Sequence, residues 1–307
     1  MLEMKRLRLL WELSARGTVA RVAEALNYSP SAVSQQLALL EREVGTPLFR
    51  RVGRTLELTA AAEALVAETG DLLAGLERAE IAVQLAQGEV AGTVRVAVFQ
   101  TVVLAFLPSV LRRLRDEHPR LRIEMVQHEP ETALQETRVR GFDLVVAEQY
   151  PGHATAQFPG LDREHLARDS IALGLPAPGT ADAEFDAVDR LEAAATLPWV
   201  MEPHGAASRH WAEQACRSAG FEPDVRYETA DLQSHVRLIE SGNAVALLPG
   251  LMSAGERSRM RLVGLAGDPH RSIFTAARIS NAGHPAVRAV RDALGAEAAA
   301  LTRTAKP

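Results

Sequence analysis

The chain has 307 residues, 47% of them hydrophobic and 24% charged, a composition that excludes a disordered chain and a length that predicts about two domains of roughly 150 residues each. Its single cysteine, Cys216, excludes an intrachain disulfide and a cysteine-based zinc site. The net charge is −5, yet residues 1–59 hold nine Lys and Arg against six Asp and Glu while residues 60–307 hold 25 against 33, as expected of a nucleic-acid-binding head on an acidic body.

No segment of the sequence has the pattern of an export signal or a membrane span. The basic residues near the N-terminus are followed by Trp11 and Glu12, which leave no apolar core for a signal peptide. The most apolar run, 96–110, contains Pro108 and is shorter than the roughly 20 residues that span a bilayer. We therefore expect a cytoplasmic protein that does not contact a membrane.

Three short helices, each with one apolar face, are expected in the first 45 residues. Their apolar positions recur with the period of an α-helix and form three sets: Leu7, Leu10, Trp11 and Ser14; Val19, Val22, Ala23 and Leu26; Val33, Leu37, Leu40 and Val44. Thr18 is a suitable N-cap for the second helix and Ser29 for the third, with Pro30 at the first helical position. Only Asn27 and Tyr28 separate these two helices, which predicts a helix-turn-helix.

A basic wing and a long helix follow. Arg50, Arg51 and Arg54 lie in and before a turn, and the alternating residues 55–58 predict a short strand behind it. The stretch 59–87 has a helical pattern with mostly apolar residues at heptad positions: Leu65, Leu72, Ala79 and Ala86 at one, and Thr69, Leu76 and Val83 at the other. This short, imperfect coiled coil predicts a helix that joins two chains.

The exposed face of the third helix carries mainly small polar side chains: Ser31, Ser34, Gln35, Ala38 and Arg42. Serine and glutamine hydrogen-bond base edges in the major groove, and wing arginines neutralise phosphates or enter the minor groove. Each feature alone is also typical of a solvated surface. Together, after a tight turn and in the basic part of an acidic chain, they predict binding to double-stranded DNA.

Strands and helices alternate after the glycine-containing segment 88–92. Strands at 93–99, 121–127 and 143–147, separated by helices near 101–117 and 130–140, predict a βαβαβ unit with a parallel sheet. Further strands are expected near 171–175, 198–202, 225–228, 245–248 and 272–278, and further helices near 206–218, 231–241 and 284–300. The predicted fold class is α/β with an all-α head that carries a wing.

The run GTVARVAEALNYSPSAVSQQLALLEREVGTPLFRRVGRTLELT resembles the winged helix-turn-helix of the LysR-type transcriptional regulators, and the resemblance extends over residues 2–65. It implies that residues of the third helix face the major groove and that the long helix is a dimerisation linker. The expected DNA-binding residues are Thr18, Ser29, Pro30, Ser31, Ser34, Gln35, Arg50, Arg51 and Arg54. The chain departs from the family at Pro30, where Gln is usual, and at Ala60 and Ala62, where Pro and Gly are usual.

The remainder resembles the LysR effector domain through the runs TVRVAVFQTVVLAFLPSVLRRLRDEHPRLRIEMV, GFDLVVAE and ACRSAGFEPDVRYETADLQSHVRLIESGNAVALLP. This implies two Rossmann-like lobes of periplasmic-binding-protein type, between which the chain crosses twice. The expected domains are a winged helix-turn-helix at 1–59, a linker helix at 60–88 and an effector domain at 89–307, with lobe one at 93–165 and 270–303 and lobe two at 166–269. The resemblance also implies a homodimer or homotetramer on promoter DNA, with RNA polymerase as a further partner.

Ligands of open α/β sheets bind beyond the carboxyl ends of parallel strands, where helix N-termini converge. This rule selects a site for an unidentified small-molecule effector at Phe99, Gln100, Thr101, His128, Glu129, Glu148, Glu202, Gly205, Ser208, Thr229, Asp231 and Pro249. Family members often carry a hydroxyl where this chain has Phe99, so we expect an effector with a ring or an aliphatic body. The alternative is that Phe99 fills the cleft and no effector binds.

No motif in the sequence predicts enzymatic chemistry, a metal or a cofactor. There is no G-x-S-x-G elbow and no phosphate-binding loop, and the histidines lack the spacing of metal ligands. Cys216 is expected to be a small core residue. The sequence therefore predicts a DNA-binding regulator whose action depends on a small molecule; an architectural or effector-independent DNA-binding repressor, and a bilobal solute-binding protein, are the alternatives.

Overall fold

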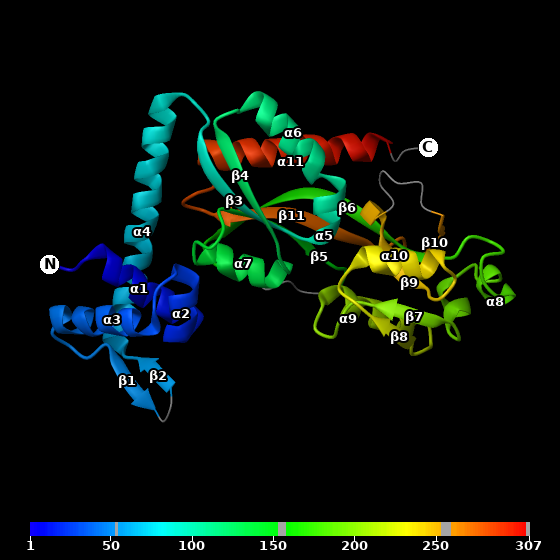
Figure 1. Cartoon of the computed structure of the whole chain (residues 1–307), viewed down its shortest axis with the longest axis horizontal. Coiled ribbons are helices and arrows are strands. Elements are labelled where there is room, and N and C mark those ends of the chain that lie inside the picture. The colour runs from blue at the N-terminus through cyan, green and yellow to red at the C-terminus, as the bar shows by residue number, and fades with distance from the viewer. Residues whose placement is uncertain (53–54, 153–157, 253–258, 305–307) are drawn as a thin grey trace. The chain divides into compact units, whose positions relative to one another are not determined.

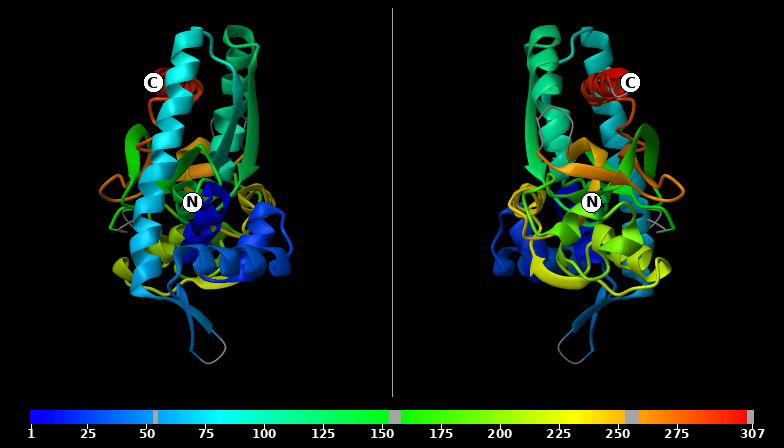
Figure 2. Two further views of the ribbon diagram at one scale, coloured as in Figure 1. Left: turned by 90° about the vertical axis from the view of Figure 1, so that its left-hand side faces the viewer. Right: turned by 90° about the vertical axis from the view of Figure 1, so that its right-hand side faces the viewer.

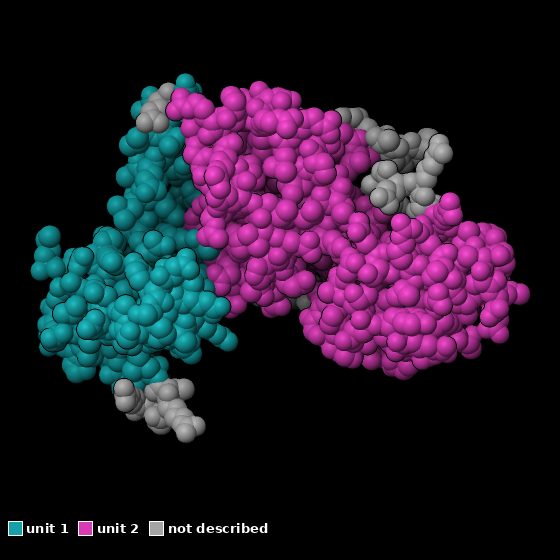
Figure 3. Space-filling view, in the orientation of Figure 1, with its two compact units in different colours: residues 1–89, 139–141, 279–285 teal, residues 90–138, 142–278, 286–307 magenta. Residues whose placement is uncertain are grey.

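The computed structural model describes residues 1–52, 55–152, 158–252 and 259–304 (Figure 1). The chain divides into two compact units, coloured separately in Figure 3. The first contains residues 1–89 with 139–141 and 279–285, and the second contains residues 90–138, 142–278 and 286–307. None of the described helices is long and apolar enough to cross a membrane.

The first unit consists of three short helices, a two-stranded wing and one long helix: α1 (Met4–Arg16), α2 (Val19–Leu26), α3 (Pro30–Val44), β1 (Phe49–Val52), β2 (Thr55–Leu58) and α4 (Ala60–Gln87). The side chains of Thr18 and Ser29 accept hydrogen bonds from the N–H groups of Arg21 (3.3 Å) and Ala32 (3.2 Å), which satisfies donors that have no partner inside the helix. Asn27 has a left-handed backbone (φ 55°) and ends α2. Asn27 and the Ser29 cap thus bound the predicted turn between α2 and α3, while Thr18 caps the other end of α2.

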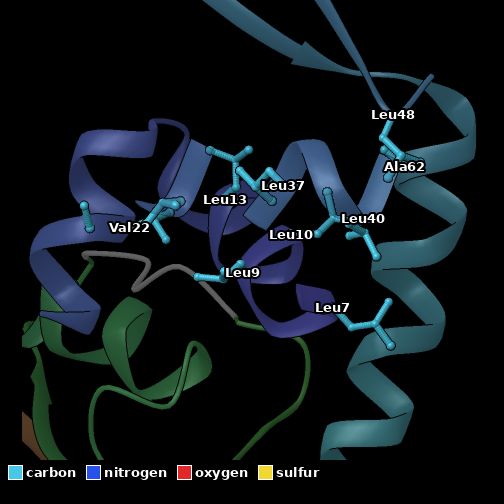
Figure 4. Close-up of a cluster of buried hydrophobic side chains, with 11 residues drawn as sticks. Leu7, Leu9, Leu10, Leu13, Val22, Leu37, Leu40, Leu48 and Ala62 are labelled. Atoms are coloured by element: carbon cyan, nitrogen blue, oxygen red, sulfur yellow. The ribbon is translucent and has the colours of Figure 1, made fainter. Parts of the chain in front are cut away.

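One apolar cluster holds α1, α2, α3 and the start of α4 together; we call α1–α3 and the wing the head. Leu10 and Leu40 are 0% exposed, and Figure 4 shows them among leucines contributed by α1 and α3. Leu48 and Ala62 join the same cluster and connect it to the wing and to α4. The predicted stripe on α1 was wrong at its end, because Ser14 is exposed while Leu13 takes the buried position.

The wing is an antiparallel hairpin in which β1 pairs with β2, and Figure 2 shows it projecting from the helices of the head. Arg50 lies opposite Glu57 in the register, and their side chains form an ion pair at 2.8 Å. Arg54 lies outside the described residues. The sequence predicted only the second strand, because the first contains two adjacent arginines and shows no clear alternation.

The second unit alternates strands and helices. Its elements are β3 (Gly92–Val98), α5 (Gln100–Ala105), α6 (Leu107–Glu117), β4 (Leu121–Gln127), α7 (Pro130–Arg138), β5 (Leu144–Gln149), β6 (Leu161–Leu175), α8 (Ala183–Asp186), β7 (Pro198–Met201), α9 (Ala207–Ser218), β8 (Asp224–Glu228), α10 (Leu232–Glu240), β9 (Ala246–Pro249), β10 (Arg261–Gly264), β11 (His270–Arg278) and α11 (Pro285–Thr304), with 3₁₀ turns at Leu191–Ala194 and Gly250–Met252. Each strand expected from the sequence overlaps one of these.

Strands β4, β3 and β5 are parallel neighbours, which confirms the predicted βαβαβ unit. β11 and β6 continue this sheet in the antiparallel sense, and β9 and β10 pair with the far end of β6. Helices α6 and α11 cover one face of the sheet and α7 the other (Figure 1). β7 and β8 form a separate parallel pair that is joined to β9 by the bridge between Trp199 and Val245. The carboxyl ends of β5 and β7 supply residues of the cleft described below.

Two predicted elements have different bounds in the structure. The helix expected near 101–117 is divided into α5 and α6 at Phe106, because Pro108 lacks the N–H that would continue the first helix. The strand expected near 171–175 begins ten residues earlier, at Leu161. Its first part is rich in charged residues, which pair with arginines elsewhere in the unit; Asp162, for example, accepts hydrogen bonds from Arg291 at 2.8 and 2.9 Å.

Candidate DNA interface and ligand cleft

Ser34 and Gln35 lie exposed on α3, on the face opposite the buried Val33 and Leu37. The hydroxyl of Ser34 and the amide of Gln35 therefore face solvent and are available to a ligand of this helix face. The hydroxyl of Ser29, in contrast, is used within the protein: it caps α3 and lies 3.0 Å from the hydroxyl of Ser31. Pro30 occupies the first turn of the helix.

The remaining residues predicted to bind DNA flank this face. Thr18 is exposed and caps α2, which places its backbone at a helix N-terminus. Arg50 is 68% exposed in its side chain and pairs with Glu57 across the wing. Arg51 lies in β1 opposite Leu56. The structure thus gathers polar and basic groups on α3, at the start of α2 and on the wing, within one unit.

Helix α4 carries a row of exposed apolar side chains beyond the head. Leu72, Leu76 and Val83 are 49%, 48% and 57% exposed and follow the heptad spacing. The two heptad positions nearest the head differ, since Leu65 packs against the head core and Thr69 is 0% exposed. The apolar row available for a partner is therefore shorter than the seven positions of the sequence pattern.

A cleft of about 470 Å³ opens in the second unit beside the ends of β5 and β7. It brings together five of the twelve residues predicted to bind an effector: Glu129, Glu148, Glu202, Gly205 and Ser208. The N-terminal residues of α7 and α9 also line it. A smaller cavity of about 20 Å³, room for one water molecule, shares Glu202 and Ser208 with the cleft and is also lined by Pro249.

Arg271 is the buried centre beneath this cleft. It is 1% exposed, and its guanidinium donates to Asp169 (2.8 Å), to Glu148 and to Thr101 (2.7 Å). The guanidinium carbon also lies 5.3 Å from the ring centre of Phe99, a cation–π contact. Thr101 and Phe99 therefore contact Arg271, are 0% and 7% exposed, and do not line the cleft.

Two glutamates at the cleft have pKa values above the ordinary range. Burial raises the pKa of Glu202 to about 7, against the effect of the hydrogen bond that Ser208 donates to it, and the charges of Glu148 and Glu129 raise it further. Burial also raises the pKa of Glu148, although Arg271 acts in the opposite direction. Near neutral pH the carboxyl of Glu202 is therefore only partly ionised, and the carboxylate of Glu148 is paired with Arg271.

Gln100 links two segments that lie 131 residues apart in the chain. Its side-chain amide donates to Asp231 (2.6 Å) and its carbonyl oxygen accepts from the N–H of Leu232 (2.9 Å). Asp231 also caps α10 by accepting from the N–H of Gln233 (3.1 Å). The amide of Gln100 thus occupies the N-terminus of α10, one of the helix N-termini expected at the ligand site.

The other predicted effector residues support neighbouring groups. The carbonyl oxygen of Thr229 accepts a hydrogen bond from the Nε2 atom of His235 at 2.8 Å. The Nδ1 atom of His128 is buried without a partner among the described residues, and its ring contacts Phe142 edge-on. Neither Thr229 nor His128 lines the cleft.

Three buried residues at the site were not predicted from the sequence: Arg271, Tyr150 and His235. Burial raises the pKa of Tyr150 well above its usual range and lowers the pKa of His235. Arginine is most often a surface residue, and tyrosine and histidine occur both inside and on the surface, so no sequence pattern distinguished them. Cys216 is 0% exposed in an apolar cluster and burial raises its pKa to about 12, which confirms it as a core residue.

Among the described residues, no group of three or more His, Cys, Asp or Glu side chains is placed to hold a metal ion.

Two family models match the chain and together cover most of its length. Residues 4–63 match the family described as bacterial regulatory helix-turn-helix protein, lysR family, and residues 87–299 match the LysR substrate binding domain. The chain belongs to the LysR family. It is a LysR-type DNA-binding transcriptional regulator with an effector-binding domain, a family that is not enzymatic.

Curated relatives of this LysR-type protein match over most of its length. The malonate utilization transcriptional regulator of Klebsiella pneumoniae is 27% identical over 262 residues, which cover 85% of this chain and 84% of that protein. The HTH-type transcriptional activator IlvY of Salmonella typhimurium is 28% identical over 251 residues, which cover 81% of this chain and 82% of that protein.

Solved structures share the fold of the LysR-type chain at lower identity. A full-length OxyR point variant from Pseudomonas aeruginosa superimposes with a TM-score of 0.65 and 19% identity, covering 96% of this chain and 95% of that one. Full-length CbnR, in complex with its target DNA, gives a TM-score of 0.54 and 19% identity, covering 96% of this chain and all of that one (100%). These likenesses confirm the predicted winged head and two-lobed α/β body.

Proposed function

We propose that two copies of this regulator join through α4 and place the exposed faces of their α3 helices in successive major grooves of a promoter, with the wing against the adjacent backbone. The proposal rests on one observation: Ser34 and Gln35 are both exposed on a capped helix that follows a tight turn. The complex of CbnR with its target DNA, a protein of the same fold, supports this placement.

The domain boundaries in this proposal are 1–59 for the head, 60–88 for the linker helix and 89–307 for the effector domain, whose two lobes meet at the cleft. A small molecule that prefers one arrangement of the lobes shifts the spacing of the two α3 helices, and does so only as far as its affinities for the two arrangements differ. The assembly acts in the cytoplasm as a dimer or a dimer of dimers and contacts RNA polymerase.

Substituting Ser34→Ala or Gln35→Ala is expected to reduce the preference for the native promoter over scrambled DNA. A lost bidentate contact with a base edge corresponds to about 1 to 3 kcal/mol of discrimination. Fluorescence anisotropy with both DNAs at one fixed salt concentration measures the ratio of the two Kd values.

The control is Ser14→Ala, an exposed serine on α1 whose hydroxyl donates to the carbonyl of Trp11 at 2.9 Å. This variant should keep the full preference. An equal loss of affinity for promoter and scrambled DNA in the α3 variants would remove Ser34 and Gln35 from base recognition.

Dimerisation through α4 predicts that Leu76→Glu separates the two copies. Leu76 is 48% exposed in the single chain, and a glutamate there would bring an unpaired charge into the apolar contact. Sedimentation velocity should show monomers for Leu76→Glu and the parental assembly for Leu85→Glu, a 62% exposed leucine on the opposite side of the helix. An unchanged assembly in both variants would place the interface elsewhere.

A further inference from the structure

The chemical class of the effector follows from the charges around the cleft. Carboxylates come from both sides of it: Glu129 and Glu131 at the start of α7, Glu148 on β5, and Glu202 at the end of β7. Glu129 and Glu131 are exposed, whereas Glu148 is 14% exposed in its side chain. Apart from these, His204 is the charge-bearing side chain among the described lining residues. The lining is therefore acidic, and no lysine or arginine is among its described residues.

The arginines nearest the cleft have their donors committed to the protein itself. Arg271 is held by Asp169, Glu148 and Thr101, as described above. Arg209, which is 6% exposed, donates to Glu213 and to the carbonyl oxygen of Glu202 at 2.9 Å. A carboxylate or phosphate ligand could bind either arginine only by displacing one of these pairs.

A buried hydrogen-bond acceptor without a partner provides an independent observation. His235 is 2% exposed, and its Nδ1 atom has no partner among the described residues. Because Nε2 donates to the carbonyl of Thr229 and burial keeps the ring neutral, Nδ1 carries a lone pair. The ring lines the small cavity together with Glu202, Ser208 and Tyr150. The cavity has room for one water molecule, and a water or an N–H donor placed there would satisfy this acceptor.

We propose that the effector of this regulator carries a protonated amine, which binds at Glu202 and Glu148 between the ends of β7 and β5. The inference rests on the proposed function, since it assigns a ligand class to the effector cleft. The N-termini of α7 and α9 also border the cleft and by themselves favour an anion. Glutamates at the same space oppose this effect, because each ionised carboxylate carries a unit charge against the roughly half charge of a helix terminus; Glu148 is offset by Arg271, and Glu202 gains its charge near pH 7.

The first test uses the full-length protein and four probes of similar length: diaminobutane, butylamine, butanediol and succinate. Thermal unfolding and titration calorimetry should show binding of the two amines, with the diamine stronger, and no binding of the diol or the dicarboxylate. Binding of succinate without binding of either amine would overturn the assignment while leaving an effector site in place. No response to either amine would also overturn it.

The second test uses Glu202→Gln, which keeps the shape of the side chain and removes its charge. Amine affinity should fall about tenfold or more, the order expected for a charge-assisted hydrogen bond. Glu184→Gln, at an exposed glutamate of α8, should bind amines as the parent does. Equal affinities in the two variants would remove Glu202 from the site. If Glu202→Gln does not fold, the comparison of probes on the parent chain still decides.

The affinity for amines should also rise with pH. The groups around Glu202 come from five elements: Ser208, His204 and Arg209 in and beside α9, Glu148 and Tyr150 at β5, Glu129 and Glu131 at α7, Arg271 on β11 and His235 on α10. Because burial raises the pKa of Glu202 to about 7, it is mostly protonated at pH 6 and mostly ionised at pH 8, while an alkyl amine stays charged at both. The Kd for butylamine should fall about tenfold over this range, and Glu202→Gln should flatten the change.

Promoter binding, measured in parallel without any amine, separates this inference from the proposed function. If the protein binds its promoter selectively but does not respond to amines, the amine effector is refuted and the proposed DNA-binding function stands. If the parent chain shows no preference for promoter over scrambled DNA, the proposed function is refuted whether or not amines bind.

Discussion

Arg271→Met should destabilise the second unit by about 3 to 5 kcal/mol, the cost of removing one partner from a buried ion network. The variant leaves Asp169 (5% exposed) and Glu148 without their shared counter-ion, and the hydroxyl of Thr101 loses its donor. Urea denaturation followed by circular dichroism measures the loss. The gap to the parent should narrow as the pH falls, because the two stranded carboxylates become neutral by taking up protons in the folded variant.

Arg217→Met is the matched control. Arg217 pairs with Glu222 at 2.6 Å on the surface, where solvent screens the pair, so no measurable loss is expected. A parental stability for Arg271→Met would mean that the buried carboxylates are already protonated in the folded protein, contrary to the ion network described here.

Leu40→Ala should abolish DNA binding by unfolding the head. Leu40 is 0% exposed in the cluster that joins α1, α2, α3 and the start of α4, and truncation of such a leucine costs about 3 to 5 kcal/mol. A domain of this size has a total stability of only about 3 to 9 kcal/mol. Calorimetry should show that the unfolding transition of the head disappears or moves to a much lower temperature, while the transition of the second unit is unchanged.

Leu85→Ala, at an exposed leucine of α4, should leave both the transition and the DNA affinity unchanged within about 0.5 kcal/mol. If Leu40→Ala retained promoter binding at the parental affinity, the head core would be less important for the DNA-binding conformation than its burial indicates.

The head and the parallel strands were predicted well from the sequence because these elements follow apolar periodicity. The turn between α2 and α3 carries its own signals in Ser29 and Pro30, and both act there as expected. The start of β6 was not predicted, because its charged residues find partners only in the folded chain, as Asp162 does in Arg291.

Cleft residues at the ends of strands were expected from the sequence, whereas the buried residues beside the cleft were not. Glu148 and Glu202 follow from the rule that parallel strands present ligands at their carboxyl ends. Arg271 could not be found in this way, since it lies within an antiparallel strand and is buried only because Asp169 and Glu148 neutralise it. The link from Gln100 to Asp231 depends on the tertiary arrangement, which no local pattern encodes.

The length of β6 limits how the effector domain can move. One continuous strand pairs with β11 along residues 161–170 and then with β9 and β10 along residues 171–175, so both proposed lobes share its backbone. A wide opening about a flexible joint would break that ladder, whereas a small rotation about the strand axis keeps every bond. We therefore expect a ligand in the cleft to change the twist of β6 by a small angle, limited by the hydrogen bonds of the sheet, and not to swing the lobes widely apart.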